Sequence, residues 1–556
     1  MAALLLIWSA SCLFYLRRFA FVMTDMTMEH TTQVAGLWHL AHSFTGNDRL
    51  SALLQVGSYY PRLPGLLGLA ALSLFEPESI WSLRALSLAW TALGAVALYL
   101  LTRDRAGGMA GIAAATLWLS MPLVLCEARA YTWQTQMTAC GAWSLLLFSR
   151  SRGFTRPGLA ALGGVCGALC LLSVRGLPYL LLAPPAVALA LQALVQARRE
   201  GRVGRASAGM LIGGALCLLP ALPFTLKYLL TWGHRLGWQT FGQYPQGETQ
   251  GASAPLFYIS GFFTHGAGPL LGTAIVLGLI AALAFRRLRD PWIWVWALLP
   301  ILALSTFGTK MVIYMVVALP AFAVLAALGA AALPRPRLRN VALLTLTGCA
   351  LLSLGWYNFA APALSPVDPS QPAPELQRRA NLYEIANYAL AGDPTPARQM
   401  LSLLEQSQPT AVALLAGSGD DVGFGGLAVE LQYAHPALPL MILYPFVDLY
   451  PRELGRMWVV RSSEANQPAG RQIAQLGRCL DRLKIRVYKV EQVQQVLRFL
   501  FSLPVEPLGS VRLGPARFEL PVVALAPHAQ PSDSTRLIWP CKRASICLAG
   551  GRIVER

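Results

Sequence analysis

Residues 84–126 read RALSLAWTALGAVALYLLTRDRAGGMAGIAAATLWLSMPLVLC. Two apolar runs, 84–102 and 108–126, are separated by a short break that carries Arg103 and Arg105. An α-helix rises 1.5 Å per residue, so a run of about 17–25 apolar residues is long enough to cross the hydrocarbon core of a bilayer. The stretch therefore predicts two membrane-spanning helices joined by a short basic turn.

The composition of the whole chain agrees with a membrane protein. Only 13% of the 556 residues are charged and 55% are hydrophobic, with a mean hydropathy of +0.49. Soluble domains usually carry about a quarter charged residues, so most of these apolar side chains must face lipid or other helices. The net charge of +18 resides largely in short clusters between apolar runs. We therefore expect membrane lipids as partners and no nucleic acid.

The same pattern continues on both sides of the opening stretch. We predict about eleven spans, at 2–16, 84–102, 108–126, 133–149, 157–174, 177–196, 208–226, 268–285, 291–307, 311–333 and 340–357. The fold class is a polytopic α-helical membrane protein. Residues 1–360 form the transmembrane domain.

The basic clusters orient this domain. They follow every second span, at Arg103 and Arg105, Arg150 to Arg156, Arg198 to Arg205, Arg286 to Arg289, and Arg335 to Arg339. Cytoplasmic loops are enriched in Lys and Arg, so we place all five clusters in the cytoplasm. The alternate junctions then face outward, including the outer loop 17–83, the break at 127–133, the loop 227–267 and the turn at 306–310.

Two outward segments are long enough to have structure of their own. In the loop 17–83, the stretches 31–44 and 63–75 are too polar or too short to span and are predicted as helices along the membrane surface. Residues 361–556 have a globular composition, with predicted strands at 411–415, 438–443, 457–460 and 485–490 and a helical pattern at 469–483. This alternation predicts an extracytoplasmic α/β domain.

The first ionisable group on the outer face follows the first span. Asp25 and Glu29 lie one helical turn apart and His30 follows them, so the two carboxylates could share one face. A carboxylate at a membrane edge is costly unless it is hydrated, paired or used, and Asp25 could serve as a general base. The alternative is that Asp25 caps the surface helix that follows.

Two further groups lie at outward junctions. Glu127, Arg129 and Tyr131 interrupt two apolar runs, and Arg offers a forked set of donors to a phosphate. Lys310 opens a late helix with Tyr314 one turn below, a pair that could bind a lipid phosphate. The alternatives are an ordinary polar loop, and a snorkelling Lys beside an interfacial Tyr. Outward-facing candidates of lower weight are Arg62, Arg84, Arg175 and His265.

Taken in order, these motifs resemble those of the GT-C superfamily of membrane glycosyltransferases, in the group of protein O-mannosyltransferases and lipid A aminoarabinose transferases. The matching elements are the acidic first outer loop, Tyr59-Tyr60-Pro61-Arg62-Leu63, Arg84 at the start of a helix, Glu127-Ala128-Arg129-Ala130-Tyr131, and Lys310 with Tyr314. The chain departs from the family pattern at Met26, where an acidic pair is usual, and at Arg62, where a second Pro is usual.

The resemblance implies an inverting glycosyltransferase of the bacterial inner membrane, with a sugar on a polyprenyl phosphate as donor and a lipid, glycan or protein as acceptor. It implies catalytic roles for Asp25, Glu29 and Glu127, and binding of the donor phosphate by Arg129, Lys310 and Arg84. It implies substrate binding by His30, Tyr59, Tyr60, Tyr131, His265 and Tyr314. It leaves the cofactor unknown, with a divalent cation held by Glu127 as one option.

Two other classes of function remain open at this point. A secondary transporter would carry charges or broken helices near the middle of the membrane, and often paired repeats. A catalytically inactive scaffold of the same fold is compatible with the departures at Met26 and Arg62.

Overall fold

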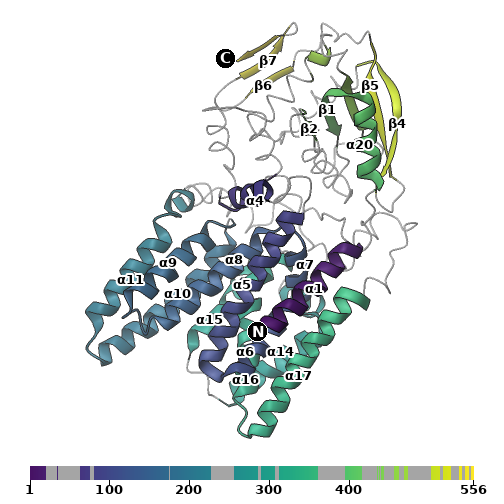
Figure 1. Ribbon diagram of the computed structural model, residues 1–556. Coiled ribbons are helices and arrows are strands. Elements are labelled where there is room, and N and C mark those ends of the chain that lie inside the picture. The colour runs from purple at the N-terminus through teal and green to yellow at the C-terminus, as the bar shows by residue number, and fades with distance from the viewer. Residues whose placement is uncertain are drawn as a thin grey trace.

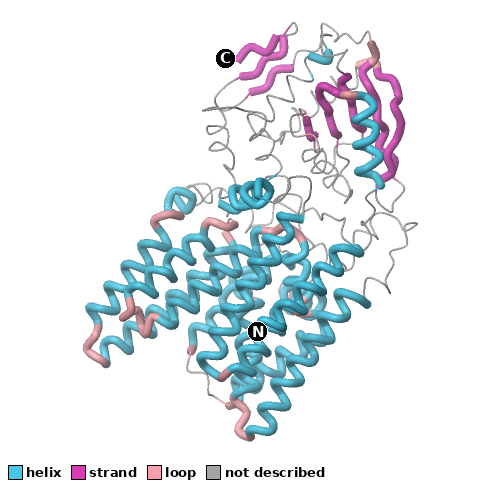
Figure 2. The backbone as a smooth tube through the Cα atoms, in the orientation of Figure 1, coloured by secondary structure: helices cyan, strands magenta, loops and turns pink. Residues whose placement is uncertain are grey.

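A computed structural model describes two parts of the chain. In the first part it describes residues 1–19, 34, 63–74, 81–174, 176–226, 256–285, 290–306 and 312–360. In the second part it describes residues 395–415, 435, 438, 440–443, 456–461, 469–471, 473, 503–513, 518–527, 537–540, 545–549 and 552–555. The first part is a helical bundle and the second contains two β-sheets and a helix (Figures 1 and 2).

Each of the predicted spans overlaps a helix of the bundle. The long or apolar helices are α1 (Ala2–Phe19), α5 (Trp81–Ala106), α6 (Gly108–Leu119), α8 (Trp133–Arg150), α9 (Pro157–Leu171), α10 (Leu177–Arg199), α11 (Val203–Leu218), α14 (Gly268–Ala284), α15 (Pro291–Ser305), α16 (Leu319–Ala331) and α17 (Pro336–Gly355). Shorter elements at their ends are α7 (Pro122–Arg129), α13 (Phe257–Gly261), the π-helix η1 (Phe262–Gly266), the 3₁₀-helix η2 (Val312–Val317) and the π-helix η3 (Trp356–Ala360).

Only some of these helices are long enough to cross a bilayer by themselves. In the described part, three helices pass by length and composition, 82–106, 177–199 and 336–359, or up to five if each of two bent pairs is one span. Other apolar helices, including α1, α9, α11, α15 and α16, are 10–17 residues long over their apolar part. The helices predicted from the sequence are thus confirmed, whereas the number of eleven crossings stays a prediction.

Two pairs of helices are bent, and the first bend corrects a predicted span. The predicted span 108–126 is two helices, α6 and α7, which meet at an angle of 67°. Pro122 occupies the first turn of α7, and because proline has no N–H it cannot continue the hydrogen bonding of α6. The second bend, of 116°, separates α13 and η1 from α14 at Gly268, whose φ is +75°. Glycine is the residue that tolerates this conformation.

The centre of the bundle is α16, whose residues 319–330 are all buried. It packs closely on α14 because two glycines face each other. A Cβ on Gly329 would lie 1.9 Å from the carbonyl oxygen of Gly278. Contact at backbone distance between membrane helices depends on such small residues.

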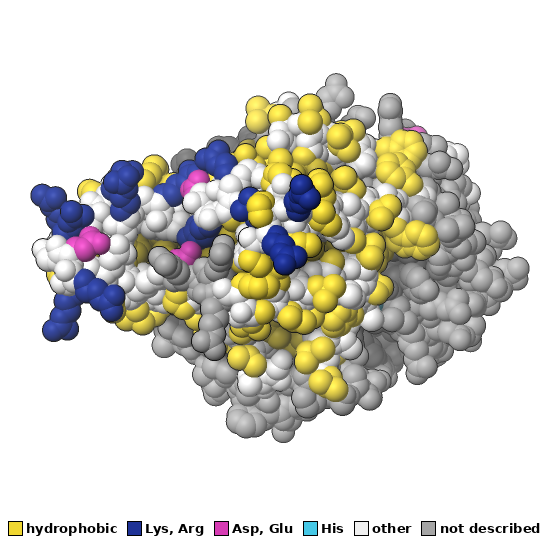
Figure 3. All heavy atoms as spheres, turned by 90° about the horizontal axis from the view of Figure 1, so that it is seen from below, with side chains coloured by type: hydrophobic (Ala, Val, Ile, Leu, Met, Phe, Trp, Pro, Cys, Tyr) yellow, Lys and Arg dark blue, Asp and Glu magenta, His cyan; other side chains and the backbone are white. Residues whose placement is uncertain are grey.

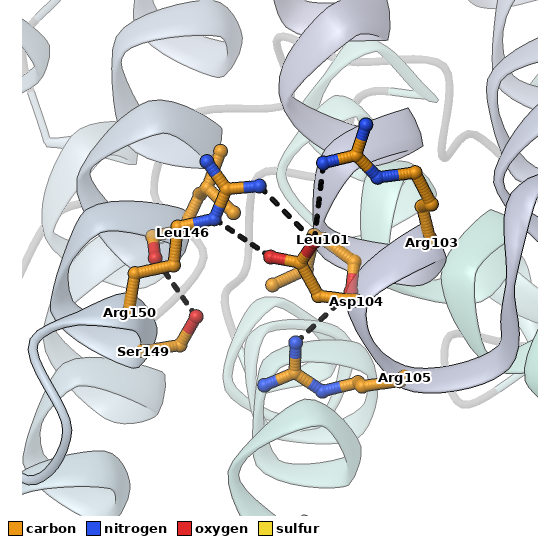
Figure 4. Close-up of polar contacts among 7 residues, drawn as sticks. All are labelled: Leu101, Arg103, Asp104, Arg105, Leu146, Ser149 and Arg150. Carbon is orange, nitrogen blue, oxygen red and sulfur yellow. Dashed lines mark hydrogen bonds and ion pairs between the residues drawn. The ribbon is translucent and has the colours of Figure 1, made fainter.

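Four of the five basic clusters gather at one end of the bundle, which is seen from below in Figure 3, and the fifth, Arg286 to Arg289, lies outside the described residues. Figure 4 shows part of this basic end, where Asp104 of α5 accepts hydrogen bonds from Arg150 of α8 at 2.6 and 3.1 Å. Arg103 lies 3.5 Å from the same carboxylate, and Arg105 pairs with Asp290, just before α15, at 2.6 Å. These ion pairs join the ends of α5, α8 and α15. The cytoplasmic placement of this end stays a prediction.

The opposite end of the bundle carries the remaining elements. Helix α4 (Leu63–Leu74) lies across this end rather than parallel to the other helices, with the β-sheets beyond it (Figure 1). The helix predicted at 63–75 is therefore confirmed. Apart from Val34, the helix predicted at 31–44 lies outside the described residues.

The second part of the chain has a five-stranded mixed sheet of order β2-β1-β3-β5-β4. Its strands are β1 (Pro409–Leu415), β2 (Leu440–Leu443), β3 (Arg456–Arg461), β4 (Val505–Leu513) and β5 (Phe518–Leu525). Helix α20 (Thr395–Ser407) packs against β3 and β4. A separate antiparallel sheet contains β6 (Leu537–Pro540), β7 (Ser545–Ala549) and β8 (Arg552–Glu555).

The predicted strands at 411–415, 438–443 and 457–460 correspond to β1, β2 and β3. The strand predicted at 485–490 and most of the helix predicted at 469–483 lie outside the described residues. Strands β4 to β8 were not predicted. The boundary at residue 361 stays a prediction.

Candidate functional site

The candidate site is at the end of the bundle opposite the basic end, around helix α7. All eight residues of α7 are buried, including Glu127 and Arg129. The helix contacts α1, α5, α8, η1 and η2. The sequence predicted a short polar turn at 127–133, whereas the structure has Glu127 and Arg129 within a helix that neighbouring elements cover.

The guanidinium of Arg129 is enclosed by α1 and η3. Its carbon lies 3.8 Å from the centre of the Tyr15 ring, a cation–π contact that is strongest when water is excluded. Its Nη2 donates to the side-chain oxygen of Asn358. Asn358 in turn donates to the Ser11 hydroxyl at 2.9 Å, and Ser11 donates to the carbonyl of Trp8 at 2.8 Å. Arg129 is thereby tied to two other helices.

Two nitrogens of the same guanidinium, Nε and Nη1, are buried without a hydrogen-bond partner in the described structure. Arg129 is only 1% exposed, and no ion pair within the described ranges neutralises it. A buried donor without a partner costs about 1–3 kcal/mol, and more when it is charged. Such a group is suited to an anion that supplies the missing acceptors.

Glu127 is also buried, and its Oε2 has no partner among the residues described. Residues two apart on an α-helix point to opposite sides. This explains why Glu127 and Arg129 do not form an ion pair although they are close in sequence. The carboxylate and the guanidinium therefore point to different sides of α7.

Tyr131 connects the site to α4. Its hydroxyl donates to the carbonyl of Pro64 at 2.8 Å. A Cβ on Gly68 of α4 would lie 2.6 Å from the same hydroxyl oxygen, so the close approach depends on glycine. The predicted substrate-binding role of Tyr131 stays a prediction, and the structure adds a role in docking α4.

The other described candidates are near α7. Arg84, in the first turn of α5, is buried and interacts electrostatically with Tyr15, the residue that covers Arg129. His265 is in η1 and Tyr314 is in η2, and both of these elements contact α7 and each other. The Thr264 hydroxyl and the His265 Nδ1 are 2.6 Å apart.

The remaining candidates lie outside the described residues: Asp25, Glu29, His30, Tyr59, Tyr60, Arg62, Arg175 and Lys310. Within the described ranges, no group of three or more His, Cys, Asp or Glu side chains is arranged to hold a metal ion.

Sequence reasoning missed Ser11, Tyr15 and Asn358. They are single polar or aromatic residues within apolar helices, and nothing in their spacing relates them to Arg129, which is 229 positions away from Asn358. Only the packing of α1, α7 and η3 reveals them.

No protein-family model matches the sequence, and no curated protein matches it. Solved structures, by contrast, match the fold of this chain. The crystal structure of ArnT from Cupriavidus metallidurans bound to undecaprenyl phosphate matches with a TM-score of 0.54 and 16% identity, over 80% of this chain and 84% of that chain. The apo structure of the same ArnT matches with a TM-score of 0.54 and 15% identity over the same shares.

This chain has a GT-C fold. The resemblance inferred from its motifs is thereby confirmed at the level of fold. In the GT-C fold of this chain, the end of the bundle that carries α4, α7, η1, η2 and η3 brings together the described candidate residues.

Proposed function

We propose that this chain is an inverting glycosyltransferase that moves a sugar from a polyprenyl-phosphate donor to an acceptor hydroxyl. The observation that carries the proposal is the buried guanidinium of Arg129, two of whose nitrogens lack a partner in the described structure. The GT-C fold supports it, as does the undecaprenyl phosphate bound to the structurally similar ArnT.

Arg129 is suited to the donor phosphate. A guanidinium forms strong, charge-assisted hydrogen bonds to phosphate oxygens. Tyr15 and Asn358 hold it in one position, so little conformational entropy is lost when the phosphate binds. Lys310 and Arg84 are proposed as further cations for the same phosphate.

The reaction is a single displacement at the anomeric carbon. The acceptor oxygen forms a new bond to that carbon while the bond from the carbon to the donor phosphate oxygen breaks, and its electron pair leaves with the phosphate. Negative charge increases on the leaving phosphate, so a fixed cation such as Arg129 stabilises the transition state. Attack from the face opposite the leaving group inverts the configuration.

Asp25 is proposed as the base that takes the proton of the acceptor hydroxyl, with Glu29 beside it. Glu127 is proposed to hold a sugar hydroxyl or a divalent cation, because its carboxylate is directed away from Arg129. His30, Tyr59, Tyr60, Tyr131, His265 and Tyr314 are proposed to line the sites for sugar and acceptor.

The proposed location is the bacterial inner membrane, with the basic end in the cytoplasm and the C-terminal α/β domain outside. The arrangement of the basic end supports this orientation, since cytoplasmic loops carry the excess of Lys and Arg. A donor carried by a membrane lipid would reach the site without a nucleotide-binding loop.

The test uses membranes that contain the wild-type chain or the variants D25N, R129Q and K310A, with a panel of polyprenyl-phosphate hexoses and pentoses labelled in the sugar. Wild type should release free polyprenyl phosphate and transfer the label to another molecule. Each variant should transfer at least about a hundredfold more slowly, because D25N removes the proposed general base, and R129Q and K310A each remove a cation that stabilises the leaving phosphate.

R103Q is the matched control, because it removes an arginine at the basic end of the bundle. It should retain wild-type transfer. If the wild-type chain moves labelled donors across the membrane and releases no polyprenyl phosphate from any of them, the transporter interpretation replaces this one.

A further inference from the structure

The basic end carries two kinds of arginine. Arg103, Arg105 and Arg150 pair with Asp104 or Asp290 and join helices. A second group occupies the turn at 151–157 between α8 and α9 and the junction at 198–205 between α10 and α11, which together we name the arginine tip. It contains six arginines (Arg152, Arg156, Arg198, Arg199, Arg202 and Arg205), all exposed, and one carboxylate, Glu200.

The arginines of the tip are largely unpaired. Arg202 lies 3.5 Å from Glu200, and no ion pair in the described structure engages the other five. Six positive charges against one negative charge leave the tip at +5. Guanidinium groups without an internal counter-ion at a common surface attract an anion from outside the chain.

The two segments of the tip are held together by close packing of small residues. A Cβ on Gly209 of α11 would lie 1.9 Å from the carbonyl oxygen of Phe154 in the first turn. A Cβ on Gly153 of the same turn would lie 3.7 Å from the Cβ of Ala193 in α10, near the second segment. The arginines therefore project from one rigid surface.

Helices α10 and α11 each have a stripe of exposed apolar side chains along the face that ends at the arginine tip. On α10, Val187, Leu191 and Val195 are more than half exposed. At about 100° per residue they lie within roughly 80° of one another and of Arg198 on the helical wheel. On α11 and its C-cap residue Leu219, the exposed side chains of Ile212, Leu216 and Leu219 share a face with Arg205 in the same way.

The dimensions of this arrangement match a lipid. From Val187 to Arg198 is about 16 Å along the helix axis at 1.5 Å per residue, close to half of a hydrocarbon core of about 30 Å. An acyl chain against such a stripe would put its phosphate at the arginine. An acidic protein would satisfy the charges but would leave the stripes without a partner.

We propose that the arginine tip, with the adjoining stripes of α10 and α11, binds anionic phospholipid, with the phosphate at Arg198 and Arg205. This surface is at the end of the bundle opposite the proposed catalytic site, and the inference does not depend on the proposed reaction.

The test titrates the purified full-length protein, in detergent, with phosphatidylglycerol and with phosphatidylcholine of the same acyl chains, and counts bound lipids by native mass spectrometry. Wild type should bind phosphatidylglycerol at least tenfold more tightly than phosphatidylcholine. R198Q/R205Q should bind phosphatidylglycerol about 25-fold more weakly than wild type, since each arginine at an anionic membrane surface contributes roughly fivefold. Binding of phosphatidylcholine should not change, which shows that the variant is folded.

Two variants sharpen the result. R398Q/R471Q removes the same charge from the second part of the chain and should bind phosphatidylglycerol as wild type does. R198K/R205K should bind with intermediate affinity, because lysine keeps the charge but lacks the forked donors. Equal wild-type affinities for the two lipids would overturn the proposal, as would full binding by R198Q/R205Q. Displacement of phosphatidylglycerol by polyglutamate at equal concentration would also overturn it, in favour of an acidic protein.

Discussion

Replacing Asn358 with Asp tests whether Arg129 is the group that binds the donor phosphate. In the wild type, Asn358 offers a neutral oxygen to Arg129 and an N–H to Ser11. Asp would offer a charged oxygen to Arg129. The Ser11 hydroxyl, which donates to the Trp8 carbonyl, could rotate and donate to the new carboxylate instead.

The expected effects on stability and on binding have opposite signs. The wild-type bond already includes one charge, that of Arg129, and N358D adds the attraction of an opposite charge to it. Desolvation of the new carboxylate offsets part of this attraction, so N358D should raise the free energy of unfolding by at most about 1–2 kcal/mol. A carboxylate and a phosphate about 5 Å apart on one guanidinium repel each other by roughly 3 kcal/mol at an effective dielectric constant of about 20. The affinity for undecaprenyl phosphate should fall on the order of a hundredfold.

The assay measures thermal unfolding and the Kd for undecaprenyl phosphate in the same detergent. N358A is the companion variant: it leaves a third nitrogen of Arg129 without a partner and should lower stability by about 1–3 kcal/mol. N358D with higher stability and an unchanged Kd would refute the reasoning, because the phosphate would then bind elsewhere.

Three further predictions concern packing and charge. Gly68→Ala should lower the free energy of unfolding by about 1–3 kcal/mol, because the new methyl group would lie 2.6 Å from the Tyr131 hydroxyl oxygen. The control is Gly214→Ala on α11, where the new methyl group would meet nothing within 4 Å. It should raise the free energy of unfolding by up to about 1 kcal/mol. Gly209→Ala should be destabilising by at least as much as Gly68→Ala, since the methyl group meets the backbone carbonyl of Phe154; normal expression and thermal unfolding would contradict this. Asp104→Asn removes a partly exposed pair with Arg150, so it should lower stability by at most about 1 kcal/mol at low salt and by less in 1 M salt; a salt-independent loss would contradict the ion-pair explanation.

The helices of the bundle could be predicted from the sequence because each one is a continuous apolar run, and the lipid requirement for internal backbone hydrogen bonds leaves few other structures. The bends between helices could not be predicted from the sequence in the same way. Pro122 was visible in the sequence, but proline is tolerated inside membrane helices, and α10 contains Pro184 and Pro185 without a break. Whether a proline ends a helix depends on the neighbours that satisfy the freed backbone groups.

The candidate site was predicted in part. Glu127 and Arg129 were found because charges within an apolar stretch are costly and therefore conspicuous. Their surroundings were not found. Asn358, Ser11 and Tyr15 are common residues at unremarkable positions, and their relation to Arg129 depends on contacts between segments hundreds of residues apart.

The sequence by itself determined that this chain is a helical membrane protein with its arginines at alternate junctions, because apolar run length and charge position are properties of local sequence. The tertiary structure alone decided that the predicted turn at 127–133 begins within a buried helix, and that Arg129 is held by α1 and η3 with two nitrogens unpartnered in the described structure. Burial and hydrogen-bond satisfaction depend on which segments pack together, and local sequence does not carry that information.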